Sequence, residues 1–292
     1  MKKDNQLAAG LRAQSKRAIA DMVALAQTEG CIPIAASAFD HNPDLINTPT
    51  GIVDLRTGKL LPHDPEGLHM KCTSVGPDFG MLTPRFDAFM QEVFSHDETV
   101  IDFMTAWLGY CLSGRTSEEK LLFLMGAGAN GKSVLMKLLL ALMGDYAASV
   151  AMSSLMQQRP GAIRSDLAAL QGVRLAVANE GNRGDVMDTA IVKGLTSGDP
   201  LTVRRLYGEP FTYTPAAKFM IASNHRPQVD GDDSAIWRRF EVVPFQRQFQ
   251  PHEQDQRLFE KLLAEGPGIL ACQSASNRDP LSARKRDPLC VA

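Results

Sequence analysis

The stretch GAGANGKS at positions 126–133 constrains the fold more than any other part of this chain. Five apolar residues precede it at positions 121–125, which is typical of a strand buried on both faces of a sheet. Apolar residues then recur at helical spacing as far as Gly144, which is expected to end a helix. A strand, a glycine-rich turn and a helix in this order predict an α/β fold whose turn binds phosphate.

The turn follows the pattern G-x-x-x-x-G-K-S of a Walker A loop. We expect its three glycines to give positive φ angles and room for a ligand, so that backbone N–H groups and the helix N-terminus surround phosphate oxygens. Lys132 is expected to reach the β- and γ-phosphates, and Ser133 to bind Mg²⁺. The alternative is a glycine-rich turn without a ligand, which the flanking strand and helix disfavour. The predicted cofactors are ATP and Mg²⁺, held by Gly126, Ala127, Gly128, Ala129, Asn130, Gly131, Lys132 and Ser133.

Composition limits the remaining classes of protein. The 292 residues are 44% hydrophobic and 22% charged, which is ordinary for a globular chain of one large or two smaller domains. The formal net charge of -2 means that nucleic-acid binding must come from a local basic patch or from a ring of subunits. Five cysteines without a C-x-x-C pair argue against a zinc ribbon or a disulfide framework. Together with the lack of a signal peptide or a long apolar run, they predict a cytoplasmic protein that does not bind membranes.

Patterning divides the chain into three parts. Residues 1–115 are expected to form a mainly helical N-terminal domain, with two helices between Pro84 and Ser113. A polar connector ends this part, and residues 116–265 are expected to form the nucleotide-binding domain. Residues 266–292 become polar and lose any period, which predicts a disordered or aberrant tail.

Two further apolar strands are followed by polar residues. The strand at 175–178 precedes Glu180, and the strand at 219–222 precedes Asn224. Ligands sit at the carboxyl ends of strands in open α/β sheets, so both side chains are candidates for the site. A carboxylate at Glu180 can orient the attacking water and help Ser133 hold Mg²⁺, and the amide of Asn224 can bond both the γ-phosphate and the water. The alternative for Glu180 is a helix cap on a surface loop.

Arg238 and Arg239 stand just before another apolar strand. This placement is typical of an arginine finger that a neighbouring subunit supplies to the transferred phosphate. Paired arginines are also common on solvated faces, and the pair alone favours that interpretation. His225 is more typical of a structural loop histidine than of a catalytic one.

Four segments in this order resemble the motif series of superfamily 3 helicases. They are closest to the helicase half of phage and plasmid primase-helicases, a group that includes the poxvirus-type proteins. The upstream stretch NTPTGIVDLRTGKLLPHDPE resembles the part that precedes the motor in that group, so the likeness extends roughly from Asn47 to Gly268. The four segments are FLMGAGANGKS, RLAVANEG, KGLTSGDPLTVRRLYGEPFTYTPAAKFMIASNHRP and DDSAIWRRFEVVPF.

The resemblance implies an AAA+-like P-loop ATPase core, with a three-layer sheet and flanking helices, preceded by a smaller and mainly helical domain. It implies a homo-oligomeric ring, most often a hexamer, that translocates on single-stranded DNA and unwinds forked duplex beside other replication proteins. By position, Glu180 is the catalytic acid, Asn224 the sensor, and Arg239 rather than Arg238 the finger.

The same resemblance places DNA contacts in the motif between acid and sensor. The candidates there are Lys193, Arg204 and Arg205, and Arg204 also suits the nucleotide interface between subunits. A solvated basic face is the alternative, and interleaved acidic residues dilute these charges. Six copies converging on a pore are therefore expected to hold DNA where one copy binds it weakly.

The sequence departs from the family at both ends. Fewer than 50 residues precede the recognisable region, without zinc-ribbon spacing, so we expect no primase activity in this chain. At the other end, the polar tail suggests a frameshifted or truncated prophage remnant in a bacterial host, with Arg284, Lys285 and Arg286 solvated.

Three functions remain open from the sequence. The first is a DNA-dependent ATPase of helicase type, and the second is a P-loop kinase of a small molecule. The order of acid, sensor and paired arginines, with no evident arginine-rich lid loop, favours the first. The third is a truncated remnant that binds nucleotide or DNA without unwinding.

Overall fold

The computed structural model describes residue 10 and residues 12–30, 32–158, 164–179, 186–225, 228–229 and 234–276. The chain separates into two units, residues 1–41 and residues 42–292. The first unit contains the surface helix α2 (Lys16–Ala26) and the short 3-10 helix η1 (Ala36–Ala38). The side chain of Ser15 caps α2 by accepting a hydrogen bond from Ala18 N, at 3.3 Å.

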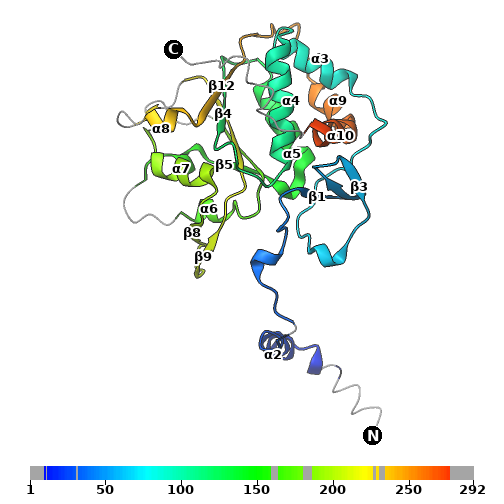
Figure 1. Ribbon diagram of the computed structural model, residues 1–292, viewed down its shortest axis with the longest axis vertical. Coiled ribbons are helices and arrows are strands. Elements are labelled where there is room, and N and C mark those ends of the chain that lie inside the picture. Colours follow the sequence, from blue (N-terminus) through cyan, green and yellow to red (C-terminus); the bar gives the residue numbers. More distant parts are fainter. Residues whose placement is uncertain are drawn as a thin grey trace. The chain divides into compact units, whose positions relative to one another are not determined.

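A parallel five-stranded sheet forms the centre of the second unit, in the order β12-β4-β10-β6-β5 (Figure 1). The predicted α/β fold is confirmed, with helices flanking the sheet. Because β10 lies between β4 and β6, the strand that ends near Asn224 separates the strand of the phosphate loop from the strand that precedes Glu180. The strands are β4 (Leu121–Met125), β5 (Ala147–Val150), β6 (Leu175–Asn179), β10 (Lys218–Ser223) and β12 (Phe240–Pro244).

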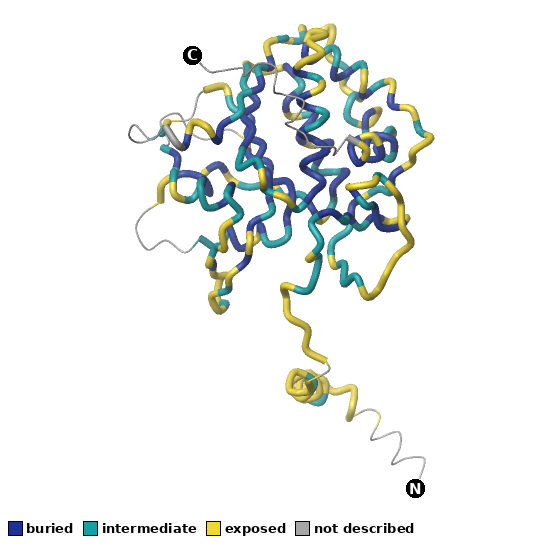
Figure 2. Tube along the Cα trace, viewed as in Figure 1, coloured by how far each residue is buried: buried dark blue, intermediate teal, exposed yellow. Residues whose placement is uncertain are grey.

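Helices cover both faces of this sheet, and its three central strands, β4, β10 and β6, are mostly buried (Figure 2). Leu122 and Leu124 of β4 face one core, whereas Leu121 and Phe123 face the other, as the alternation of a strand requires. The first core is built with α3 (Pro84–Val93), α4 (Glu98–Leu112), α5 (Lys132–Met143), α9 (Leu258–Ala264) and α10 (Gly266–Ser276). The second is built with η4 (Met152–Leu155), α6 (Ser165–Ala168), α7 (Thr189–Ser197), α8 (Ser234–Trp237) and the hairpin of β8 (Leu201–Arg204) and β9 (Pro210–Tyr213). This part of the chain also contains η3 (Gly144–Tyr146) and the paired strands β7 (Val186–Met187) and β11 (Gln228–Val229).

The segment before the sheet belongs to the same unit. It begins with a small antiparallel sheet, and the apolar faces of α3 and α4 then share one core with α5. The compact unit therefore starts near residue 42, and not at the predicted connector of residues 113–120, because these two helices bury their apolar faces against α5 and the sheet. The elements of this segment before α3 are β1 (Leu45–Thr48), β2 (Gly51–Asp54), β3 (Lys59–Leu61) and η2 (Pro65–Gly67).

Helix α10 corrects the expectation of a disordered tail from residue 266. It packs beside α4, with Ile269 and Leu270 buried in the first core. The sequence pattern missed it because a glutamine and a serine are buried on the same helix, which leaves almost no amphipathic period. Residues 277–292, which include Arg284, Lys285 and Arg286, lie outside the described residues.

Lys218 is a buried cation at the amino end of β10. Its side chain is 1% exposed, and Nζ donates hydrogen bonds to Ser113 O and to Ala216 O, the latter at 3.0 Å. The ammonium also lies 5.1 Å from the centre of the Tyr110 ring. Burial lowers the pKa of Lys218 to about 7, against a small opposing effect of Cys111. Lys218 thus connects the end of α4 to the sheet, although removing its ammonium group from water disfavours the charged form.

Replacing Lys218 by methionine is expected to change how stability depends on pH. Between pH 7 and pH 10.4, the unfolded chain keeps a proton that folded Lys218 has released, so the free energy of unfolding rises with pH. The rise from this group amounts to about 2 kcal/mol between pH 7 and pH 9. Urea unfolding at pH 7, 8 and 9 should show that rise in the natural chain and a flatter curve in Lys218→Met. Parallel curves for the two proteins would contradict it.

Candidate nucleotide and DNA site

The phosphate loop connects β4 to α5, as the sequence predicts. Gly131 has a φ of 89° and caps α5, but the other left-handed residue of the loop is Ala129, with a φ of 56°. Gly126 and Gly128 do not have positive φ, which corrects the expectation that all three glycines would. Within residues 126–133 the backbone is left-handed at Ala129 and Gly131, and both residues lie close to the N-terminus of α5.

The lack of room for a side chain explains why glycine occupies two of these three positions. A Cβ on Gly126 would lie 2.3 Å from Phe245 O, and a Cβ on Gly131 would lie 2.8 Å from Val93 Cγ2. A Cβ on Gly128 would meet no atom within 4 Å. Gly126 and Gly131 are thus required by the close packing of β12 and α3 around the loop, whereas the packing leaves Gly128 room for a side chain.

Replacing Gly131 by alanine is expected to lower the free energy of unfolding by about 2 kcal/mol, because the new methyl group clashes with Val93 and the backbone must keep a left-handed φ. The matched control is Gly128→Ala, which meets open space. Chemical denaturation without nucleotide measures both variants. Equal stability of the two proteins would show that α3 yields freely and would contradict the packing argument.

The segment that follows β12 holds the loop from the other side. The buried side chain of Asn130 donates to Ala127 O and, at 3.3 Å, to Phe245 O. Phe249 N donates to Ala129 O at 2.8 Å. The sequence includes Asn130 only as one of the variable positions of the Walker A pattern. No local feature indicates that its amide bonds the residue that follows β12.

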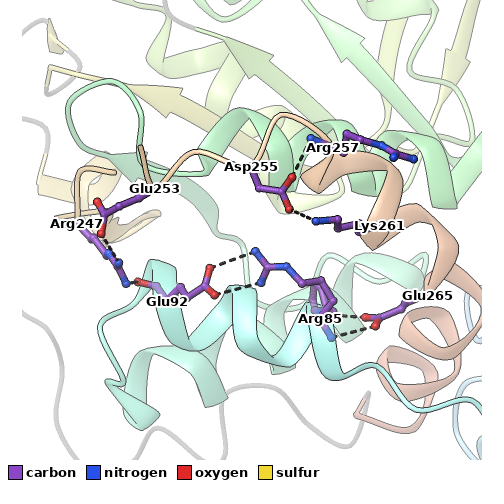
Figure 3. A network of polar contacts seen from close by, with 9 residues as sticks. Arg85, Glu92, Arg247, Glu253, Asp255, Arg257, Lys261 and Glu265 are labelled. Atoms are coloured by element: carbon purple, nitrogen blue, oxygen red, sulfur yellow. Dashed lines mark hydrogen bonds and ion pairs between the residues drawn. The ribbon is translucent and has the colours of Figure 1, made fainter. Parts of the chain in front are cut away.

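A polar network connects these two supports of the loop (Figure 3). The carboxylate of Glu265 accepts hydrogen bonds from Arg85 N and Phe86 N at 2.9 and 2.8 Å, which caps α3. Arg85 pairs with Glu92 at 3.3 Å, and Arg247 donates to Glu92 O at 3.3 Å. The helix that packs on Gly131 and the segment that bonds Ala129 are therefore tied together by charge-assisted contacts.

Lys132 and Ser133 stand at the start of α5. Lys132 is 7% exposed, and its Nζ donates to Gly126 O and, at 3.2 Å, to Ala127 O. Ser133 is exposed one residue further along the first turn. A lysine held over the loop, a hydroxyl and the N-terminus of a twelve-residue helix form a donor set that fits a nucleoside triphosphate with Mg²⁺. Among the described residues, no group of three or more His, Cys, Asp or Glu side chains is placed to hold a metal by itself.

Strand β10 carries Asn224 to the phosphate loop. Ser223 pairs with Met125, and Gly126 N donates to Ser223 O at 3.3 Å. Exposed Asn224 follows in a turn that Ser223 closes by donating to His225 O at 2.6 Å. His225 thus lies in a hydrogen-bonded turn, in keeping with a structural role.

Glu180 lies outside the described residues. The preceding residue, Asn179, ends β6 and pairs with Ala222 of β10. The described strands β6 and β10 therefore end side by side.

The two arginines of the predicted finger have different environments. Arg239 is 7% exposed; its Nη2 lies 3.0 Å from Glu119 Oε2, and its Nη1 donates to Thr196 Oγ1 at 2.9 Å. Arg238 is exposed. Both precede β12, so they lie at the end of the sheet opposite the phosphate loop of the same chain. The guanidinium of Arg239, which the sequence favoured as the finger, is thus engaged inside its own chain, whereas Arg238 lies at the surface.

The β8–β9 hairpin brings Arg204 and Arg205 together. Arg204 Nε donates to Gly208 O at 2.8 Å and closes the turn. Sequence reasoning missed the two apolar residues at its tip: Leu206 is 66% exposed and Tyr207 is 97% exposed, with a φ of 59°. The sequence feature that indicates such a tip is a tyrosine followed by glycine between two segments in which apolar and polar residues alternate.

Lys193 does not join this group, because it is half-buried on α7. It therefore lies on a different element from the two hairpin arginines.

Among the residues that the structure describes, every helix is too short or too polar to span a lipid bilayer.

Two family models match the chain. "D5 N terminal like" matches residues 4–95, and "Family of unknown function (DUF5906)" matches residues 124–239. The second match contains the phosphate loop, the strand tips and the two arginines. The first contains the small antiparallel sheet and all of α3.

Viral proteins are similar over most of this chain. A proposed helicase of Acanthamoeba polyphaga mimivirus is 30% identical over 229 residues, which are 76% of this chain and 24% of that protein. A proposed helicase of Frog virus 3 is 30% identical over 59% of this chain and 18% of its own length. A proposed primase of African swine fever virus is 27% identical over 69% of this chain and 22% of its own length. The chain thus spans about a quarter or less of these relatives.

Solved structures of the C-terminal region of NrS-1 share the fold. One apo structure superposes with a TM-score of 0.55 at 18% identity, covering 87% of this chain and 60% of that one. A second crystal form gives a TM-score of 0.56 at 18% identity, over 69% of this chain and 46% of that one.

Proposed function

We propose that this chain, which belongs to the D5-type primase-helicase family, is an ATP-hydrolysing motor of superfamily 3 helicase type that translocates on single-stranded DNA and unwinds duplex. The observation that carries the proposal is the placement of Asn224 beside a braced phosphate loop, at the shared carboxyl edge of β4 and β10. A phosphate-binding turn alone needs no such neighbour, whereas hydrolysis needs a group that senses the γ-phosphate and positions water.

Each residue of this edge has a distinct role in the proposal. Lys132 turns from the loop carbonyls to the β- and γ-phosphates, and Ser133 supplies its hydroxyl to Mg²⁺, which when bound neutralises phosphate charge. Glu180 orients the attacking water and accepts its proton. Asn224 donates its amide to the γ-phosphate and holds the water in line.

The remaining charge on the transferred phosphate is met from a neighbouring subunit. Arg238 is exposed at the far end of the sheet, so it cannot serve its own phosphate loop and suits the loop of the next copy in a ring. The proposal therefore includes a homo-oligomeric ring, and the resemblance to superfamily 3 helicases favours a hexamer. We place this motor in phage or plasmid replication in a bacterial cytoplasm, beside other replication proteins.

DNA is proposed to contact the β8–β9 hairpin. Arg204 and Arg205 supply positive charge, and Tyr207 supplies an exposed ring on which a base can stack. One copy of a chain with a net charge of -2 binds DNA weakly, so the hairpins of several subunits must act together.

The test is steady-state ATP hydrolysis with Mg²⁺, with and without single-stranded DNA, at several protein concentrations. Stimulation by DNA, with activity rising more than linearly with protein, is the expected result because the active site is composite. Nucleotide binding without turnover under any of these conditions would overturn the motor and favour a chain that only binds. Phosphate transfer to a metabolite without DNA stimulation would favour a kinase.

A further inference from the structure

A cavity of about 450 Å³ lies between the hairpin and α6. Its walls come from residues that precede β6 on one side and β10 on the other, so it lies at the amino edge of the sheet, away from the phosphate loop. The volume is within the range of small-molecule sites. The lining residues are Ser165, Ala168, Ala169, Gln171, Arg205 and Leu206.

Arg205 is held flat at this cavity. Its guanidinium lies over the ring of Phe211, 4.8 Å from the ring centre, and its Nη2 donates to Gln171 Oε1 at 2.9 Å. Contact with an aromatic ring and a hydrogen bond to an amide restrict the motion of the guanidinium, a planar group that stacks on bases as well as on aromatic rings. The lining adds the hydroxyl of Ser165 and the amide of Gln171, which can bond the edge of a polar ring.

The other lining residues are apolar. Ala168 and Ala169 line one wall, and Leu206 lines the hairpin side. One cation, two neutral polar side chains and apolar walls suit a flat heteroaromatic ring better than a phosphate, which attracts several cations or backbone N–H groups.

We propose that this cavity receives an unstacked base of single-stranded DNA as the strand passes the hairpin tip. Tyr207 and Leu206 project next to it and give the strand an apolar surface at which neighbouring bases separate. The base then stacks on Arg205, and its edge bonds Gln171 or Ser165. The inference rests on the proposed DNA-dependent function and adds a base contact to the phosphate contacts of the hairpin.

The test compares two fluorescent oligonucleotides on the full chain, one of thymidines and one of the same length with abasic sites. Loss of base stacking is expected to weaken binding of the abasic strand about tenfold. Ala169→Leu fills the cavity from an exposed position and should reduce that difference to the part that stacking on Tyr207 contributes. Ala264→Leu, an equal change at an exposed position on α9, should preserve it. Gln171→Ala removes a polar partner without filling space and should reduce it.

Two outcomes distinguish failure of the proposed function from failure of the base site alone. If the natural chain binds neither strand and DNA does not stimulate its ATPase, the proposed function fails and this inference falls with it. If the chain binds DNA but the thymidine and abasic strands bind alike, or Ala169→Leu leaves their difference intact, the base site alone is overturned.

Discussion

Replacing Lys132 by alanine is expected to lower the affinity for ATP at least about a hundredfold, because charge-assisted contacts to two phosphates are lost together. The lysine is 7% exposed and bonds the carbonyls of Gly126 and Ala127, so its ammonium already lies beside the loop and exchanges these carbonyls for phosphate oxygens when the nucleotide binds. Titration of a fluorescent ATP analogue with Mg²⁺ measures the effect.

The control for Lys132 lies on the same helix. Lys137 is exposed on α5, and Lys137→Ala removes an equal charge without touching the loop. A thermal melt of each variant separates loss of binding from loss of fold. Unchanged affinity in a folded Lys132→Ala protein would mean that the loop does not hold the triphosphate in the proposed way.

Replacing Arg238 by alanine is expected to reduce ATP turnover of the assembled protein at least about a hundredfold while leaving the free energy of unfolding unchanged. The exposed guanidinium can be removed without opening the core. Activity should partly return when Arg238→Ala and Lys132→Ala subunits are mixed, because an intact arginine then meets an intact loop across the interface. Failure of that rescue in an assembled ring would remove the assignment in trans.

Arg239→Ala is the matched variant, and its expected effect is on stability. Removing this guanidinium leaves Thr196 and the half-exposed Glu119 without their partner, which costs about 2 kcal/mol of unfolding free energy. Chemical denaturation measures it. Lost turnover with unchanged stability in Arg239→Ala, together with full activity in Arg238→Ala, would reverse the roles of the two arginines.

The edge of the sheet that carries the phosphate loop could be predicted from local patterns. The strand at 121–125, the loop and the helix are consecutive, so their order alone specifies a phosphate turn. The same holds for the strands that lead to Asn179 and to Asn224, because short apolar runs with polar ends describe buried parallel strands. Their shared edge follows from parallel pairing.

Other properties depend on contacts between residues far apart in the chain. The need for glycine at position 131 comes from Val93, and the choice between Arg238 and Arg239 comes from Glu119 and Thr196, none of which any local pattern indicates. Helix α10 was missed because packing against α4 overrides its weak pattern.

The sequence by itself determined the α/β class, the strand, loop and helix that carry the Walker A pattern, and the strand tips, since each is encoded by neighbouring residues whose periodicity and turn chemistry are local. Only the tertiary structure decided which arginine is exposed, which glycines are required and where a cavity opens beside the hairpin. Burial, steric room and ion pairing are properties of side chains that meet in space, and folding determines which ones meet.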